Sequence, residues 1–230
     1  MIAAFLRGVV VAGALVAGVY ARVLRPRVLR WGATDTEVSG QLPGDEIVPN
    51  PRYLATHAVT IRAPAATVWP WLVQMGQGRG GFYSYTWLEN LVGCDLHNAA
   101  RVIPEFQHLQ VGDKVRLVPE GNPVPLYFLA AAIHAERALV LHTAGSPAES
   151  FRAGLPYATW AFVLEPIDDG TRLIARFRAD FKPTAGGWIR NKYLLEPVHF
   201  LMERKMLLTI RRLAERLALE QGATAPRRAA

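Results

Sequence analysis

The sequence predicts an α+β domain in which one curved antiparallel sheet of six or seven strands wraps around a long C-terminal helix. Between residues 114 and 181, five segments have the length and alternation of strands and are separated by turn residues. In residues 188–220, apolar side chains recur every three or four positions, as on one face of a helix. A helix with so broad an apolar face must bury it, and the apolar face of the preceding sheet supplies the surface.

The first 24 residues are expected to form a membrane anchor. Residues 8–21 are uncharged and apolar, and together with residues 2–6 they approach the roughly 20 residues that a helix needs to cross a bilayer. A cleaved signal peptide ending at Ala21 and an amphipathic helix on the membrane surface are the alternatives. Arginines follow at positions 22, 25, 27 and 30. Cations in this place favour an uncleaved single-pass anchor in the cell membrane, with the domain on the cytoplasmic side.

The excess positive charge lies outside the predicted domain. The formal charge is +7, but five arginines precede Trp31 and two more, Arg227 and Arg228, lie in the C-terminal tail. Without these seven cations, the remaining 19 basic residues equal the 19 acidic residues. A nucleic-acid-binding domain needs cations clustered on its own surface, so nucleic acid is not an expected partner.

The next segment, residues 25–54, is expected to be a linker, followed by a folded domain at residues 55–220 and a disordered tail at residues 221–230. Between Trp31 and Arg52 the chain is rich in glycine, proline and acids and has no apolar period. Such a segment is expected to lie on the domain as an extended spacer or to float near the membrane.

The domain should begin with a strand at residues 56–62 and a helix at residues 65–75, which Pro70 would kink. The later strands are expected at residues 114–118, 126–135, 138–143, 157–165 and 171–181. Asp168-Asp169-Gly170, between the last two strands, is typical of a hairpin turn. The C-terminal helix should bend at Pro197, which cannot donate a backbone hydrogen bond.

The alternation of the last two strands predicts which side chains face the helix. In residues 171–181, polar residues that include Arg176 and Arg178 alternate with apolar ones, so one face is expected to meet water and the other to form the core. The side chains expected to point inward are Trp160, Phe162, Leu164, Leu173, Ala175 and Phe177.

Residues 61–69 (IRAPAATVW) and Val111-Gly112-Asp113 are similar to the first strand, the helix entry and a turn before a strand in the SRPBCC superfamily. Residues 69–85 (WPWLVQMGQGRGGFYSY) look like an uncharacterised, often membrane-anchored branch. The resemblance covers about 160 residues. It implies the helix-grip fold of START-like proteins, which include polyketide cyclases and lipid carriers, and it says little about activity because this fold hosts many functions.

Three glycines at positions 76, 78 and 81 have the G-x-G-x-x-G spacing of a dinucleotide-binding loop. A helix containing Pro70 precedes them where a strand is required, and no acidic residue ends a second strand further on. No cofactor is therefore expected. The loop is interpreted either as a mobile gate over a pocket or as a structural turn.

Acid–base catalysis of the cyclase or hydratase type is one hypothesis for the function. Asp95 and His97 could form a pair in which the carboxylate orients the imidazole, with Tyr85 as a proton donor. A structural hydrogen-bonded pair is the alternative. Cys94 is the only cysteine, which excludes a disulfide within the chain, and no further ligands recur at metal-binding spacing, so no metal site is expected.

The resemblance favours a second hypothesis, binding or transfer of a small hydrophobic ligand, such as a lipid or a polyketide-like molecule, in an apolar cavity between sheet and helix. Aromatic residues after the glycine loop would form a rim, and helix methionines would accept varied apolar guests. The expected partners are this ligand and, through the anchor, membrane lipids. A scaffold with a filled core is a third possibility. The ligand-binding candidates are Trp71, Met75, Phe82, Tyr85, Trp87, His97, Trp160, Phe162, Phe177, Leu194, Val198 and Met202.

Overall fold

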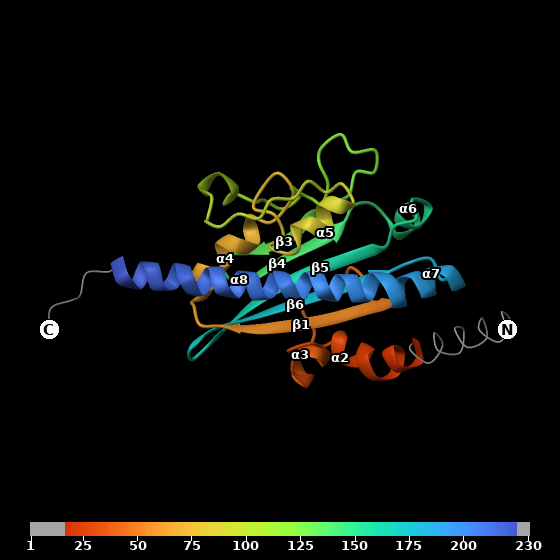
Figure 1. The fold of residues 1–230 in the computed structure, drawn as a ribbon, viewed down its shortest axis with the longest axis horizontal. Helices are drawn as coiled ribbons and strands as arrows, with labels where there is room; N and C mark the ends of the chain where they lie inside the picture. Colours follow the sequence, from red (N-terminus) through yellow and green to blue (C-terminus); the bar gives the residue numbers. More distant parts are fainter. Residues whose placement is uncertain (1–16, 225–230) are drawn as a thin grey trace, which may run out of the picture.

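A computed structural model describes residues 17–224 and contains a six-stranded antiparallel sheet with a long helix across one face (Figure 1). The strands are β1 (Tyr53–Ile61), β2 (Lys114–Arg116), β3 (Tyr127–His134), β4 (Ala138–Thr143), β5 (Tyr157–Ile167) and β6 (Gly170–Asp180). Their order is β1-β6-β5-β4-β3-β2, a meander from β2 to β6 with β1 added beside β6. The predicted α+β class and antiparallel sheet are therefore confirmed.

The predicted C-terminal helix is continuous but irregular where Pro197 interrupts its hydrogen bonding. The helices are α2 (Arg25–Val28), α3 (Asp35–Ser39), α4 (Ala65–Val73), α5 (Thr86–Leu91), α6 (Pro147–Arg152), α7 (Ala185–Arg190) and α8 (Glu196–Thr224), with π-helical turns η1 (Tyr20–Leu24) and η3 (Asn191–Leu195) and a 3-10 turn η2 (Pro104–Phe106). The expected bend at Pro197 corresponds to η3, because a proline near the start of α8 removes one backbone donor and a wider turn absorbs the mismatch.

A hairpin turn joins β5 and β6 at Asp168-Asp169-Gly170, as predicted, and it is tighter than the five residues expected between the two strands. Ile167 pairs with Gly170, which leaves Asp168 and Asp169 at the tip. Gly170 has a φ of 148°, and a Cβ at this position would collide with the carbonyl of Ile61 on β1. Only glycine meets both conditions, so the turn chemistry and the approach of β1 both require it.

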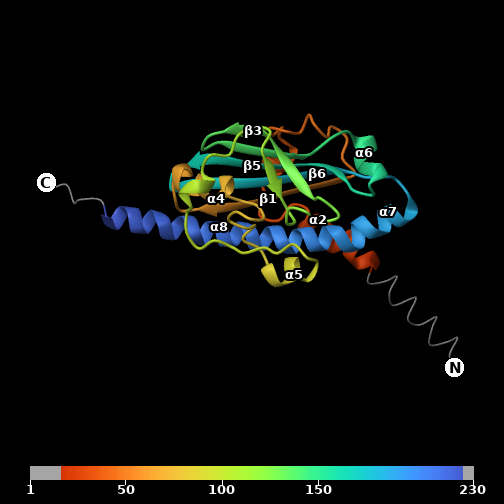
Figure 2. The same ribbon diagram turned by 90° about the horizontal axis from the view of Figure 1, so that it is seen from above.

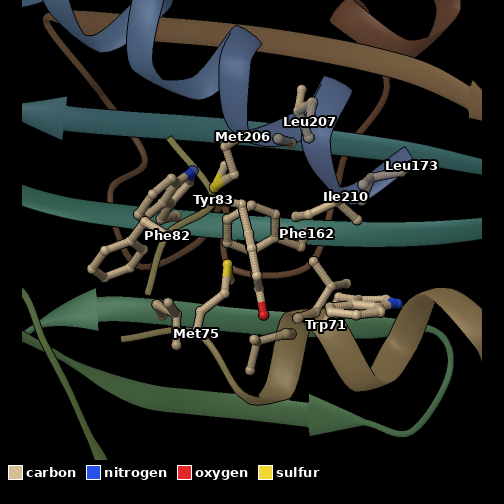
Figure 3. Close-up of a cluster of buried hydrophobic side chains, with 14 of the residues drawn as sticks. Trp71, Met75, Phe82, Tyr83, Phe162, Leu173, Met206, Leu207 and Ile210 are labelled. Carbon is tan, nitrogen blue, oxygen red and sulfur yellow. The ribbon is translucent and has the colours of Figure 1, made fainter. Parts of the chain in front are cut away.

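The main core lies between the inner face of the sheet and the helices α4 and α8 (Figure 3). Trp71 enters it from α4, Phe162 and Leu173 from the sheet, and Met206 and Ile210 from α8. Of the six side chains predicted to point inward, five are buried here and Phe177 packs against them. The alternation in β5 and β6 therefore predicted the inner face correctly.

The segment between residues 25 and 49 lies along the sheet. The amides of Thr56 and Ala58 on β1 donate to the carbonyls of Leu29 (2.8 Å) and Trp31 (3.1 Å). This pairing covers the β1 edge, which would otherwise present unpaired backbone groups. The chain then forms α3 beside β1 (Figure 1) and continues over the outer face of the sheet.

Arg176 and Arg178 point away from α8, as predicted, but the expectation that this face meets water is wrong. Arg176 is only 2% exposed, because its guanidinium donates to the carbonyl of Gly40 (2.8 Å) and forms an ion pair with Asp45 (2.7 Å). Arg178 donates to the carbonyl of Val48 (2.9 Å). The backbone of residues 37–49 supplies the acceptors that water was expected to supply.

Most of the predicted membrane anchor, residues 1–16, lies outside the described residues. Within residues 17–224, no helix combines the length and the apolar character that crossing a bilayer requires.

Candidate functional site

A partly open cavity of about 130 Å³ lies between β5, the start of α8 and the loop that contains α5. In Figure 2 the sheet lies along one side of α8 and α5 along the other. The lining residues are Phe82, Ser84, Glu89, Cys94, Leu96, Leu117, Trp160, His199, Met202, Glu203 and Met206. Most of this wall is apolar, and its titratable side chains come mainly from α5 and α8.

The loop that closes one side of the cavity is fixed by hydrogen bonds. Ser84 Oγ donates to the carbonyl of Met202 on α8 at 2.9 Å. The side chain of Asn98 accepts from the Tyr83 amide (2.7 Å) and donates to the Ser84 carbonyl (3.0 Å). Tyr83 has a φ of 59°, a conformation that a bulky residue adopts only where its surroundings hold it. This wall of the cavity is therefore preformed.

A buried polar chain behind the cavity connects β1, β5 and α8. Glu203 on α8 accepts a hydrogen bond from Trp160 Nε1 (2.5 Å) and forms an ion pair with His57 on β1. The other ring nitrogen of His57, Nε2, donates to the carbonyl of Val28 at 2.8 Å. The side chains of His57 and Glu203 have no exposed surface. A charged pair buried this deeply persists only when its remaining polar atoms are also satisfied.

The contacts of the pair also indicate its protonation. The Val28 carbonyl can only accept, so His57 Nε2 must carry a proton. Burial alone would lower the pKa of His57, but the charge and hydrogen bond of Glu203 outweigh it and raise the pKa. Burial alone would raise the pKa of Glu203, while His199, His57 and Trp160 together hold it below its ordinary value. We therefore describe the pair as an imidazolium and a carboxylate.

His199 lies beside this ion pair and, like Glu203, lines the cavity. Its Nδ1 is 2.8 Å from the Tyr53 hydroxyl, and its Nε2 is 3.6 Å from Glu203 Oε1, beyond hydrogen-bond distance. Burial lowers the pKa of His199, although the charge of Glu203 opposes the shift. The ring is therefore neutral at pH 7, and its buried Nε2 has no hydrogen-bond partner among the described residues.

Two buried polar atoms of cavity residues, His199 Nε2 and Glu89 Oε2, have no hydrogen-bond partner within residues 17–224. Burial also raises the pKa of Glu89 to about 7. Buried polar atoms are usually satisfied, so a pair of unsatisfied ones in an apolar cavity indicates a missing polar partner. The described residues include no group of three or more histidine, cysteine, aspartate or glutamate side chains that could hold a metal ion.

Replacing Glu89 with glutamine is expected to remove a pH dependence of stability. The folded-state pKa of about 7 lies above the ordinary value of 4.5. The contribution of protonated Glu89 to stability is therefore complete below pH 4.5 and is lost as the pH rises through about 7. The amide does not titrate, so the variant should unfold at a higher temperature than the wild type at about pH 8.5 but not at about pH 4. Thermal unfolding followed by circular dichroism measures this, and parallel pH profiles would contradict it.

The structure brings together three of the predicted ligand-binding residues, Phe82, Trp160 and Met202, which line the cavity. Others fill the core or pack against it, namely Trp71, Met75, Phe162 and Phe177. Leu194, in the π turn η3, and Val198, in the first turn of α8, were expected to face the sheet but are 57% and 40% exposed. Glu196, which lies between them in the sequence, is buried.

The predicted catalytic residues lie outside the cavity lining. The side chains of Asp95 and His97 are 67% and 83% exposed, and their nearest charged atoms are 3.9 Å apart. The ring of Tyr85 lies under the ammonium of Lys205, and Trp87 is exposed on α5. The acid–base role of these residues stays a prediction.

The glycine loop is a tight turn in the structure. Gly76 and Gly81 form a single antiparallel bridge, with the Gly76 amide donating to the Gly81 carbonyl at 3.0 Å. A Cβ on Gly81 would collide with Asn98. This geometry favours the interpretation of the loop as a structural turn.

Sequence reasoning did not assign His57, Glu89, His199 or Glu203 to the site, although two signals were present. His57 precedes Val59 by two residues in a strand, so both side chains lie on the same face. Glu203 lies three residues before Met206, on the buried face of the helix. A titratable residue on the inward face of a strand or helix indicates a polar site in the interior.

Neither a family model nor a curated protein sequence matches this chain. Solved structures that resemble it include a protein from Mesorhizobium loti, at 14% identity and a TM-score of 0.44 over 71% of this chain and 98% of that one. A protein from Nitrosomonas europaea has 17% identity and a TM-score of 0.43 over 71% and 95%. A polyketide-cyclase-like protein from Corynebacterium glutamicum has 13% identity and a TM-score of 0.35 over 75% and 96%. Likenesses this distant carry no information on ligand or reaction.

Proposed function

We propose that the protein binds a small, mainly apolar molecule with one hydrogen-bonding group in the cavity beside α8. The observation that carries this proposal is that two residues of a mostly apolar cavity, His199 and Glu89, each have a buried polar atom without a hydrogen-bond partner among the described residues. A ligand hydroxyl or carbonyl would supply the missing partner, and the apolar wall would bury the rest of the molecule.

The volume of the cavity limits the part of the ligand that enters it. A space of about 130 Å³ compares with engineered cavities of about 150 Å³ that bind benzene. The buried part is therefore a single ring or a short chain. A longer lipid or polyketide-like molecule would extend through the open side of the cavity, past α5.

The predicted N-terminal anchor would locate ligand binding at the membrane. An anchored domain on the cytoplasmic side of the cell membrane would stay close to the phase in which apolar molecules collect. Whether residues 1–24 anchor the chain is tested by carbonate extraction of membranes from cells that express it. Release of the intact chain by carbonate would contradict the anchor without affecting the cavity.

Binding is tested with phenol and toluene, which have the same size but differ in the hydroxyl group. The wild type should bind phenol more tightly in calorimetry, because the hydroxyl reaches a polar atom that toluene leaves unsatisfied. Met202→Trp should abolish phenol binding, since the indole would fill the cavity that Met202 lines. Overpacking of this kind should lower the stability by about 1 to 3 kcal/mol.

Leu201→Trp is the matched control, because Leu201 is the neighbouring residue, is exposed and does not line the cavity. It should leave phenol binding unchanged. If Met202→Trp folds and still binds phenol, the ligand site lies elsewhere. If toluene binds as tightly as phenol, the polar atoms do not take part in recognition.

A further inference from the structure

The beginning of the C-terminal helix carries apolar side chains that the described residues leave exposed. Leu194, Val198 and Leu201 are 57%, 40% and 45% exposed and recur at a spacing that places them on one face. Ile189 and Tyr193 continue the apolar surface toward α7. Single exposed apolar residues are ordinary, but a contiguous group of them marks an interaction site.

The helix α5 adds to this surface. Trp87 and Leu91 lie one turn apart on it and are both exposed, as is the adjacent Val92. Figures 1 and 2 show α5 next to α8, and Glu89 of α5 lines the same cavity as Met202 of α8. The apolar surface therefore borders the proposed ligand site. We call the residues Trp87, Leu91, Ile189, Leu194, Val198 and Leu201 the docking face.

The charge at the α7 end of the docking face is positive. Residues 181–195 contain Lys182, Arg190 and Lys192 and no acidic residue. Lys182 and Arg190 line a second cavity, of about 370 Å³, in which no acidic residue takes part among those described. An anionic group of the size of a lipid headgroup would find two cations there and no opposing charge.

The N-terminal segment enters the structure beside the docking face. The ring of Tyr20 lies 5.8 Å from the ring of Tyr193, and Arg25 forms an ion pair with Glu196 at 2.6 Å. The exposed Val19, Val23 and Leu24 therefore lie at the same end of the molecule. An anchor at this position would bring the docking face to the membrane surface.

We propose that the docking face lies against the surface of an anionic lipid bilayer, with an acidic headgroup beside Lys182 and Arg190. Tryptophan, tyrosine and leucine side chains next to cations are typical of protein surfaces at the lipid headgroup region. A second copy of the chain would bring like charges together in a symmetric contact. Residues 1–16 would leave those charges uncompensated, since their only charged side chain is Arg7. Of these three possible partners of the docking face, charge complementarity therefore favours the anionic bilayer.

The proposal is tested by placing a fluorescent label at two positions of the full-length chain in vesicles. With Cys94 replaced by alanine, a single cysteine is introduced at Leu194 or, as the control, at Leu219, which is 75% exposed near the other end of α8. In vesicles that contain phosphatidylserine, iodide quenching should be severalfold weaker at position 194 than at position 219. In phosphatidylcholine vesicles the difference should shrink, as it should at high salt.

The charge-reversal variant Lys182→Glu/Arg190→Glu should restore quenching at position 194 in anionic vesicles. Equal quenching at both positions in anionic vesicles would overturn the proposal. If position 194 is protected from quenching equally in anionic and neutral vesicles, and also in the charge-reversal variant, residues 1–16 cover the docking face instead. Protection that grows with the number of protein molecules per vesicle would assign it to a second copy. Phenol binding in the cavity is measured separately, so either proposal can fail alone.

Discussion

Replacing Glu203 with alanine is expected to lower the free energy of unfolding by about 3 to 5 kcal/mol, the usual cost of removing one partner of a buried ion pair. The fully buried His57 would keep its charge with no carboxylate to compensate it, or would give up its proton. Trp160 Nε1 would also lose its acceptor. Urea denaturation followed by circular dichroism measures the loss.

The loss should depend on pH in a way that identifies the pair. The pKa of Glu203 is below the ordinary 4.5, so its contribution is complete above pH 4.5 and disappears as the pH falls through the lowered value. The pKa of His57 is above the ordinary 6.5, so its contribution is complete below pH 6.5 and disappears as the pH rises through the raised value. The difference between wild type and Glu203→Ala should therefore be largest between pH 4.5 and pH 6.5.

A double variant separates the effect of charge from the effect of packing. His57→Leu leaves the Glu203 carboxylate buried without its partner. Glu203→Leu likewise leaves the His57 ring buried without its partner. The combination leaves no charge, so it should be more stable than either single variant, since apolar replacements of buried ion pairs are often well tolerated. Additive losses of stability would show that the two side chains contribute independently, which contradicts an ion pair.

The sheet and the C-terminal helix could be predicted because their signals are local. In β6, Leu173, Ala175 and Phe177 alternate with Arg172, Ile174, Arg176 and Arg178, and the arginines identify the opposite face as the outer one. The turn at Gly170 is likewise determined by a few adjacent residues. Such patterns survive in any context in which one face of the sheet is buried.

The covering of the outer face could not be predicted, because it depends on contacts between distant segments. The alternation around Arg176 shows that it points outward, but water and a layer of backbone carbonyls both satisfy a guanidinium. The segment that supplies those carbonyls lies more than 120 residues earlier, and its glycines and prolines carry no apolar period. Its role rests on backbone acceptors that sequence periodicity does not reveal.

The candidate site was predicted in part for a similar reason. Phe82, Trp160 and Met202 have apolar or aromatic side chains on elements expected to meet, so their gathering around a cavity followed from the fold. The polar residues were missed because their type favours solvent. His199 and Glu203 lie on α8 four residues apart, and Glu203 is three residues before the buried Met206, so helical spacing alone places Glu203 on the inner side.

Replacing Arg176 with leucine is expected to cost about 3 to 5 kcal/mol, because it leaves the carboxylate of Asp45 without its closest partner and removes the donors from several buried carbonyls. The guanidinium donates to Thr56 Oγ1, the carbonyls of Glu37, Val38 and Gly40, and Asp45 Oδ2. Arg176→Lys should recover only part of the loss, since an ammonium group cannot reach this spread of acceptors.

The stability loss from Arg176→Leu should begin at the N-terminal segment. Amide hydrogen exchange should accelerate in residues 34–49 and remain slow in α8, because the guanidinium of Arg176 binds Glu37, Val38, Gly40 and Asp45 of this segment while α8 packs on the inner face. Arg172→Leu is the comparison on the same strand, and it should cost less because the side chain of Arg172 is 17% exposed against 2% for Arg176. Uniformly faster exchange across both faces would show that Arg176 supports the whole sheet rather than the attachment of the segment.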